Sequence, residues 1–161
     1  SKVPGTAAAK TIQPADDYII PLGKARIFQY AQQEKIDHGE SMVVITYGMG
    51  VHWALNASKA FPGQVEILDL RTLYPYDWEA ISTSVKRHNK CFVLTEEPLM
   101  NSFAQAISGR IATELFRHLD APVRTLGAKD LPAVPLNSLL EKAMLPNVEQ
   151  VRGVMEELLD F

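Results

Sequence analysis

The stretch from Val65 to Asp77 most constrains what this chain can fold into. Its first six residues, Val-Glu-Ile-Leu-Asp-Leu, are mostly β-branched or aliphatic, which is typical of a buried strand. The chain then meets Arg71, turns at Tyr74-Pro75 and enters a helix that Asp77 is placed to cap. A strand that ends in polar residues and leads directly into a helix is the repeating unit of an open α/β sheet.

The same unit recurs along the chain. Apolar, β-rich runs predict buried strands at 42–47, 65–70, 91–95 and 123–126, with a short edge strand at 25–29. Apolar residues at helical spacing predict helices at 51–60, 77–88, 102–118 and 147–159. This alternation predicts an α/β fold in which helices cover both faces of a mostly parallel sheet.

The remaining parts of the chain show no regular period. Residues 1–17 are rich in Ala, Pro, Lys and Asp, and we expect them to form a flexible linker or tail ahead of one domain at 18–161. The polar stretch 32–40 is expected to be a loop, as is 127–145 apart from one helical turn near 137–143. Asn147 and Gln150 have the spacing of a capping box at the start of the last helix.

Composition disfavours several classes of protein. The formal net charge is −3 and no basic stripe with interleaved aromatic residues is present, so nucleic-acid binding is not favoured. No apolar run approaches the roughly 18 residues that span a bilayer, and the N-terminus carries no signal-peptide core. The one cysteine, Cys91, lies in a predicted buried strand, where a thiol is a poor nucleophile. A lone cysteine is consistent with a reducing compartment.

The residues that could take part in catalysis or ligand binding do not form a known catalytic pattern. Gly48-Met49-Gly50 follows a strand, but Trp53 stands where the dinucleotide-binding fingerprint needs a third glycine, so a tight turn is favoured over nucleotide binding. Asp69, near a strand end, is expected to make local hydrogen bonds rather than bind a ribose. Glu96 and Glu97 are neighbours in sequence and therefore point to opposite faces of the sheet, which argues against an acid/base pair.

The four histidines also lack metal-ligand spacing, and neither a P-loop nor a nucleophile elbow is present. The sequence therefore predicts no catalytic, cofactor-binding or metal-binding residue. Instead, Arg71 is expected to be structural or interfacial. Its guanidinium would pair with strand-end carbonyl groups or with a carboxylate, for which Glu96 and Glu97 are candidates.

Two stretches are candidates for a surface that a partner covers. Leu99 and Met100 follow a predicted strand on a turn, and residues 131–139 form a proline-rich segment. Neither stretch has the period of a helix or strand that would bury its apolar side chains. Met and Leu on loops adapt well to a partner surface, so we expect both stretches to lie at an interface.

Several short motifs occur along the chain in one order. They are Ile20-Pro21-Leu22-Gly23-Lys24-Ala25, Tyr47-Gly48, Leu68-Asp69-Leu70-Arg71-Thr72-Leu73-x-Pro75-x-Asp77, Glu96-Glu97-Pro98-Leu99, Leu119-Asp120-Ala121-Pro122-Val123 and Leu145-Pro146. Together they resemble the C-terminal domain of the transketolase family, over about residues 17–161. The similarity is greatest to the β subunit of thiamine-dependent 2-oxo acid dehydrogenases of the pyruvate or branched-chain type. Glu97-Pro98-Leu99 together with Phe103 favours the branched-chain type.

The resemblance implies a three-layer α/β/α unit with an open sheet of about five strands, one of them antiparallel at the edge. It implies a parent enzyme that uses thiamine diphosphate and Mg to decarboxylate a 2-oxo acid and pass the acyl group to a lipoyl arm. The thiamine-binding and catalytic groups of that enzyme belong to other domains. The present domain would therefore bind no cofactor, and it would be inactive when isolated.

The resemblance also implies partners. They are other domains or subunits of the same dehydrogenase, in a dimer or heterotetramer, and a dihydrolipoyl acyltransferase core, in the bacterial cytoplasm or the mitochondrial matrix. Asp120 and the C-terminal Phe161 resemble residues that help dock the acyltransferase. One departure is Phe103-Ala104-Gln105-Ala106, where many relatives have glycine and an acidic residue. The alternatives are the same domain of transketolase or deoxyxylulose-phosphate synthase, a non-enzymatic interaction module, and a small nucleotide-binding domain.

Overall fold

The structure, a computed structural model, describes residues 13–133 and 135–161. It contains a five-stranded sheet with the order β1-β3-β2-β4-β5. The strands are β1 Arg26–Gln29, β2 Met42–Thr46, β3 Val65–Asp69, β4 Cys91–Pro98 and β5 Arg124–Ala128. Strands β2 to β5 pair in parallel, whereas β1 pairs antiparallel with β3 at the edge. The structure confirms the predicted sheet, which is mostly parallel and has one antiparallel strand at its edge.

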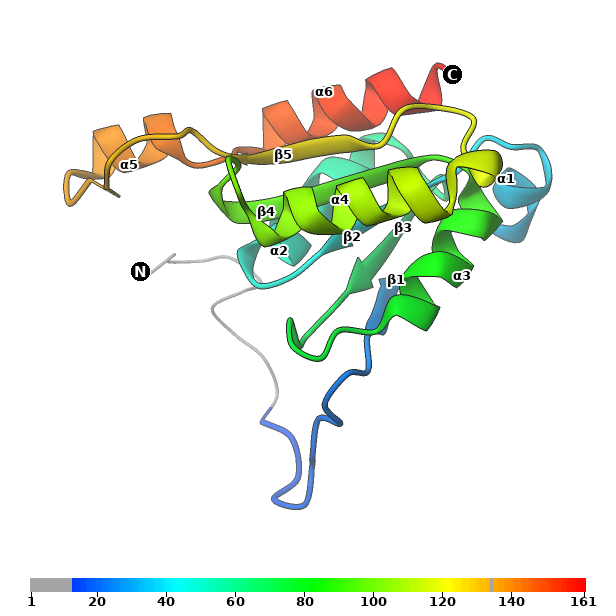
Figure 1. Ribbon diagram of the computed structural model, residues 1–161, viewed down its shortest axis with the longest axis horizontal. Coiled ribbons are helices and arrows are strands. Elements are labelled where there is room, and N and C mark those ends of the chain that lie inside the picture. The colour runs from blue at the N-terminus through cyan, green and yellow to red at the C-terminus, as the bar shows by residue number, and fades with distance from the viewer. Residues whose placement is uncertain (1–12, 134) are drawn as a thin grey trace.

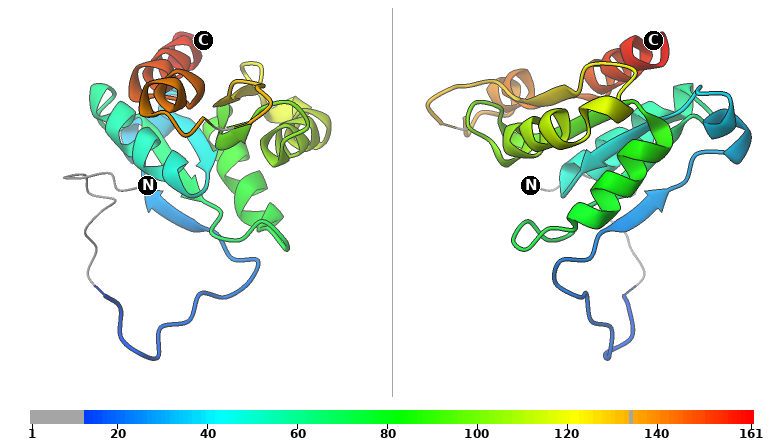
Figure 2. Two further views of the ribbon diagram at one scale, coloured as in Figure 1. Left: turned by 90° about the vertical axis from the view of Figure 1, so that its left-hand side faces the viewer. Right: turned by 45° about the vertical axis from the view of Figure 1, so that its right-hand side comes forward.

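Helices cover the two faces of this sheet and complete the three predicted layers (Figures 1 and 2). They are α1 Gln33–Asp37, α2 Met49–Ala57, α3 Trp78–His88, α4 Phe103–Glu114, α5 Ser138–Met144 and α6 Val148–Leu159, with 3-10 turns at Ser58–Ala60 and Phe116–His118. Helices α2 and α6 pack on one face, and α3 and α4 pack on the other. In the part of the chain described here, no helix combines the length and apolarity needed to cross a membrane.

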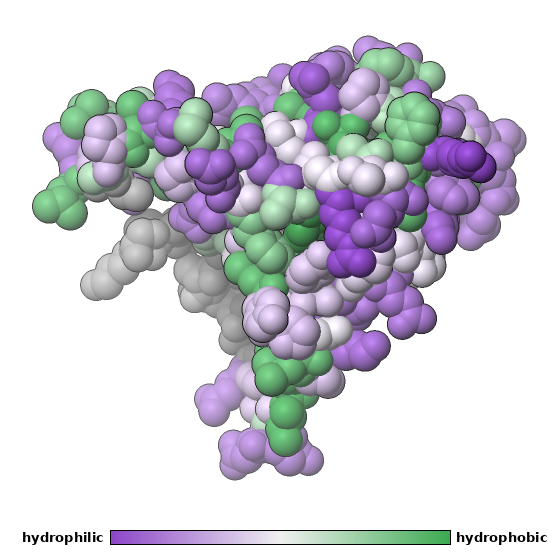
Figure 3. Space-filling view, viewed as in Figure 1, coloured by the Kyte–Doolittle hydropathy of each residue, from purple (hydrophilic) through white to green (hydrophobic). Residues whose placement is uncertain are grey.

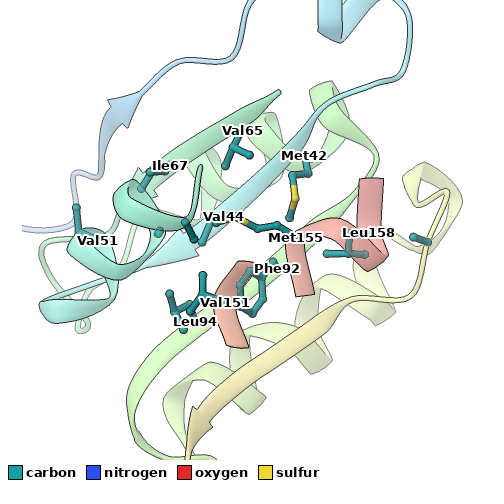
Figure 4. Close-up of a cluster of buried hydrophobic side chains, with 13 residues drawn as sticks. Met42, Val44, Val51, Val65, Ile67, Phe92, Leu94, Val151, Met155 and Leu158 are labelled. Atoms are coloured by element: carbon teal, nitrogen blue, oxygen red, sulfur yellow. The ribbon is translucent and has the colours of Figure 1, made fainter. Parts of the chain in front are cut away.

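Each face of the sheet carries its own apolar layer. Met42 and Val44 of β2 belong to the layer under α2 and α6, while Val43 and Ile45 belong to the layer under α3 and α4. All four side chains are fully buried, which explains why this strand is a continuous apolar run in the sequence. In the first layer Phe92 of β4 lies among side chains of β2 and α6 (Figure 4).

Capping side chains set where the helices begin. Asp77 Oδ1 accepts a hydrogen bond from the Ala80 N–H at 3.1 Å and caps α3, as predicted. Asn147 and Gln150 form the predicted capping box of α6. Such caps satisfy N–H groups that have no partner inside the helix, so they place a helix start at a definite residue.

The structure corrects two details of the predicted elements. Residues 32–40 contain the short helix α1; it buries none of its residues, so it leaves no apolar period in the sequence. Strand β4 continues beyond Thr95 to Pro98, because Pro98 still pairs with Ala128 of β5. Of the predicted tail 1–17, residues 1–12 lie outside the described residues and 13–17 are exposed, so the boundary at residue 18 stays a prediction.

Candidate subunit interface

The carboxyl ends of β2 and β4 are the place where a ligand site is expected in a sheet of this kind. Strand β2 leads into α2 on one face, whereas β4, its neighbour, leads into α4 on the other. Ligands of open α/β sheets bind in the crevice at such a point of divergence. Here, Tyr47, which directly follows β2, reaches across to β4 and packs edge-on against Phe103, with ring centroids 6.0 Å apart.

The polar groups at this point bind one another. Glu97 Oε1 accepts hydrogen bonds from the Tyr47 hydroxyl at 2.7 Å and from the Phe103 backbone N–H at 2.9 Å. Phe103 is the first residue of α4, so the Glu97 carboxylate occupies the positive end of that helix, where an anion would otherwise bind. Burial and the Glu97 carboxylate raise the pKa of Tyr47, which keeps the phenol protonated as a donor.

An aromatic cluster continues along the same edge. The Tyr76 ring lies edge-on to Phe103 and to Trp78, with centroid distances of 5.5 and 6.5 Å. Arg110 of α4 stacks its guanidinium 3.9 Å from the Trp78 ring and donates a hydrogen bond from Nη1 to the Tyr76 hydroxyl at 2.7 Å. These contacts link helix α4 to the loop before α3 and to the first residue of α3. Tyr76, Trp78 and Arg110 would otherwise be candidates for catalysis, but here their side chains hold these elements together.

Glycines in the turn after β2 serve packing. Gly48 begins α2 with a φ of 58°, a conformation that glycine adopts without strain. A Cβ on Gly50 would lie 2.0 Å from Thr46 Oγ1, so only glycine lets α2 approach β2 this closely. This turn is therefore the tight turn favoured from the sequence. Asp69 Oδ1 accepts a local hydrogen bond from the Arg71 N–H at 3.1 Å, again as predicted.

Arg71 lies in a strained turn directly after β3. It has a φ of 57°, and the Thr72 N–H reaches back to the Leu70 carbonyl at 2.5 Å, which closes a three-residue turn. The Arg71 guanidinium donates to the carbonyl oxygens of Lys24 at 2.8 Å and Ala25 at 3.3 Å. Of the two predicted kinds of partner, it is the carbonyl groups that bind Arg71.

The candidate pairing of Arg71 with Glu96 or Glu97 was wrong. It assumed that the strand ends of β3 and β4 are neighbours, but β2 lies between them in the sheet. Glu97 instead binds Tyr47 and the start of α4, and Glu96 is exposed. A carboxylate two strands away cannot be assigned as a partner from the sequence, because strand order is not visible there.

A pair of substitutions at Arg71 separates its two effects on stability. Arg71→Ala and Arg71→Gly both remove the hydrogen bonds to Lys24 and Ala25, but only glycine relieves the positive φ. We expect Arg71→Ala to lower the free energy of unfolding by about 1.5–3 kcal/mol, and Arg71→Gly to remain about 1 kcal/mol more stable than Arg71→Ala. Urea denaturation of the two variants measures both numbers. Identical midpoints for the two variants would show that the turn at Arg71 is not strained.

Large apolar side chains are exposed beyond the carboxyl ends of β4 and β5. Met100, on the turn after β4, is 62% exposed, and Leu99 beside it is half-buried. After β5 the chain leaves the body in an excursion that carries α5 (Figure 1). The excursion exposes Leu131, Leu136, Leu139 and Leu140, and Figure 3 shows hydrophobic side chains among hydrophilic ones in the region of α5. We call Met100 and these four leucines the apolar edge. An apolar group of this size suggests a surface that a partner covers.

The C-terminus lies at the opposite end of the molecule, where the parallel strands begin (Figure 1), and Asp120 comes shortly before the start of β5. Asp120 is exposed just before β5, and Phe161 is 62% exposed at the C-terminus. Beside Asp120, a hollow lies between Gly109 and Ala112 of α4 and Pro122, with the exposed ring of Phe116 at its side. Both residues are thus accessible to a partner, at a distance from the apolar edge.

The other side chains that could take part in catalysis or metal binding have structural roles. Within the residues that the structure describes, no three His, Cys, Asp or Glu side chains are grouped as metal ligands. Cys91 is fully buried, and burial raises the pKa of its thiol, which opposes formation of a reactive thiolate. The predicted buried strand thiol is confirmed.

One buried polar network, around Glu66, was not predicted from the sequence. Glu66 Oε2 accepts a hydrogen bond from Arg87 Nη2 and lies 3.3 Å from His88 Nε2, while His88 Nδ1 is 2.7 Å from Ser41 Oγ. Glu66, His88 and Ser41 are at most 2% exposed. The signal was present in the sequence, because a glutamate inside the apolar run Val-Glu-Ile-Leu requires a buried partner.

Comparison with known proteins shows the family to which the chain is similar. The family model described as "Transketolase, C-terminal domain" matches residues 31–151. The chain is 34% identical over 151 residues to the 2-oxoisovalerate dehydrogenase subunit beta of Bacillus subtilis (strain 168), which corresponds to 92% of this chain and 44% of that protein. It is also 34% identical over 139 residues to the pyruvate dehydrogenase E1 component subunit beta of Rhizobium meliloti (strain 1021), which corresponds to 84% of this chain and 28% of that protein.

A solved structure described as a split gene transketolase, in an inactive beta4 tetramer, has the same fold. It superposes with a TM-score of 0.71 at 16% sequence identity, over 91% of this chain and 45% of that chain. This likeness shows the fold alone. The chain thus spans less than half the length of each of these three proteins.

Proposed function

The chain belongs to the family of transketolase C-terminal domains, and on this premise we propose that it is the assembly domain of a thiamine-diphosphate-dependent 2-oxo acid dehydrogenase. The two dehydrogenase β subunits that it resembles at 34% identity support this proposal. Their substrates differ, so the proposed substrate class is a 2-oxo acid of the branched-chain or pyruvate type. The proposed compartment is the bacterial cytoplasm or the mitochondrial matrix.

The observation that carries the proposal is the contrast between the two kinds of surface at the carboxyl ends of the strands. The polar groups there, Tyr47 and Glu97, bind one another and the start of α4. The apolar edge beyond them is exposed. A catalytic site needs free polar groups, whereas a subunit interface needs exposed apolar area that a partner can cover. We propose that the apolar edge contacts another domain or subunit of the dehydrogenase, within a dimer or heterotetramer.

A second contact is proposed at the opposite end of the domain. Asp120 and Phe161 are both exposed there, in keeping with a contact to a surface of the acyltransferase core that offers a basic group to the Asp120 carboxylate. In the proposed reaction the acyl group passes to a lipoyl arm of that core. The role of this end of the domain would be to hold the core near the active site.

The residues of this domain do not fit thiamine diphosphate. The cofactor would bring a diphosphate and a divalent metal, but the start of α4 is occupied by the Glu97 carboxylate, and the start of α2 at Gly48-Met49-Gly50 carries no cationic side chain. A second anion at the start of α4 would be repelled, and the described residues offer no group of three carboxylate or imidazole ligands for the metal. We therefore derive no catalytic step from this domain and place the cofactor in another part of the parent enzyme.

The test of this assignment is a titration of the 161-residue chain with thiamine diphosphate and Mg²⁺. We expect isothermal calorimetry to detect no binding in the micromolar range, because Glu97 occupies the α4 helix start. Circular dichroism of the same sample shows that the chain is folded. Micromolar binding, or decarboxylation of a branched-chain 2-oxo acid or of pyruvate by the isolated chain, would contradict the proposal.

A further inference from the structure

Residues 13–22 form a loop, here called the arm, that stands off the body of the domain. Both views of Figure 2 show the segment projecting away from the sheet before it returns to β1. Four large apolar side chains on it are exposed: Tyr18 by 53%, Ile19 by 81%, Ile20 by 44% and Leu22 by 75%. The arm thus carries a second group of uncovered apolar side chains, separate from the apolar edge.

The base of the arm is fixed to the loop that follows β3. The Gly23 N–H donates to Thr72 Oγ1 at 2.9 Å, and the Ala25 N–H donates to Asp77 Oδ2 at 3.1 Å. The guanidinium of Arg71 donates to the Ala25 carbonyl at 3.3 Å. Asp77 is at the same time the cap of α3, so the loop is itself anchored in the body. The direction in which the arm leaves the domain is therefore set in advance.

We propose that the arm docks onto an apolar face of the domain that precedes this one in the complete subunit. The inference rests on the proposed function, since it takes the parent to be a dehydrogenase subunit. The matching family is a C-terminal domain, and the matched relatives are more than twice as long as this chain. In a subunit built in this way, the arm belongs to the segment that connects the preceding domain to this one. The tether gives that domain a high effective concentration around the arm.

The chemistry of the arm selects the kind of surface that it meets. The run from Tyr18 to Leu22, Tyr-Ile-Ile-Pro-Leu, contains no charged residue, so it suits an apolar face rather than a charged one. Pro21 lacks an N–H group, which makes the run poorly suited to pair as an added strand at a sheet edge. Side-chain packing is the remaining mode. Because the base is pre-positioned, the entropy lost on docking is small.

The experiment uses the full-length subunit and the double variant Ile19→Ser/Leu22→Ser, with chymotrypsin cleavage after Tyr18 as the readout. We expect the intact subunit to protect this site. The double variant should be cleaved at least about tenfold faster, since removing one buried aliphatic side chain changes an equilibrium by roughly that factor. In the isolated 161-residue chain, where the arm is uncovered, wild type and variant should be cleaved at the same rate. The control Tyr74→Ser changes a residue that is 96% exposed in the anchoring loop, and it should leave the protection intact.

Two results would overturn the proposal. One is rapid cleavage after Tyr18 in the wild-type full-length subunit, which would show an undocked arm. The other is a concentration-dependent dimer of the isolated chain that the double variant disperses, which would show that a second copy covers the arm. An error in the proposed function can be distinguished from an error in the docking of the arm. A full-length subunit that shows no dehydrogenase activity when assembled with its partner subunits, but has a protected arm, would refute the parent enzyme and leave the docking of the arm intact.

Discussion

Replacing Glu66 with alanine is expected to lower the free energy of unfolding by about 3–5 kcal/mol, because it removes the buried carboxylate that faces both Arg87 and the buried His88. The Glu66 carboxylate accepts a hydrogen bond from Arg87 and lies 3.3 Å from His88 Nε2, and His88 has no exposed side-chain area. Chemical denaturation with an unchanged slope measures the effect. The matched control is Glu157→Ala, which removes a solvent-exposed pair with Arg124 and should cost at most about 1 kcal/mol. Equal losses for the two variants would show that the Glu66 network is not a buried one.

The same carboxylate predicts how stability depends on pH. Burial alone would raise the pKa of Glu66, but the favourable interactions of its carboxylate with the neighbouring His88, Arg87 and Ser84 lower it to about 2 from an ordinary value of 4.5. A folded-state pKa below the unfolded one stabilises the protein fully above about pH 4.5. That contribution is lost as the pH falls from 4.5 through 2. Wild type should therefore lose stability more steeply than Glu66→Gln over this range. Parallel curves for the two proteins would contradict the lowered pKa.

The parts of the fold that depend on short segments could be predicted from the sequence. The continuous apolar run of β2 and the capping residues Asp77 and Asn147 each fix an element through contacts within a few residues. Burial of β2 on both faces leaves a pattern that is visible without any knowledge of its neighbours. Helix α1 was missed for the opposite reason, because its residues are not buried and leave no such pattern.

Contacts between distant segments were harder to predict. The partner of Arg71 depends on the order of the strands, and the length of β4 depends on its pairing with β5. For the candidate interface, the sequence located Met100 and part of the α5 excursion, because apolar residues without a regular period stand out. It did not show that Glu97 occupies the start of α4, since that contact needs the turn between β4 and α4 to be folded.

The central claim, that this domain contributes a subunit interface through its apolar edge, is tested in the full-length subunit with its partner subunit. Met100 is 62% exposed and Leu139 is 74% exposed, so the double variant Met100→Ser/Leu139→Ser should leave the stability of the isolated chain within about 0.5 kcal/mol. If these two side chains are buried at an interface, each would contribute roughly 1.5–3 kcal/mol to the free energy of association. The control Tyr30→Ser changes a residue that is 70% exposed directly after β1.

Sedimentation velocity of the purified assembly measures the outcome over a range of concentrations. We expect Met100→Ser/Leu139→Ser to shift the dissociation of the assembly to concentrations at least about a hundredfold higher, because two apolar interface residues are lost. Tyr30→Ser should dissociate at the same concentration as wild type. An assembly of the double variant that stays intact down to the concentration at which the wild type dissociates would contradict the claim.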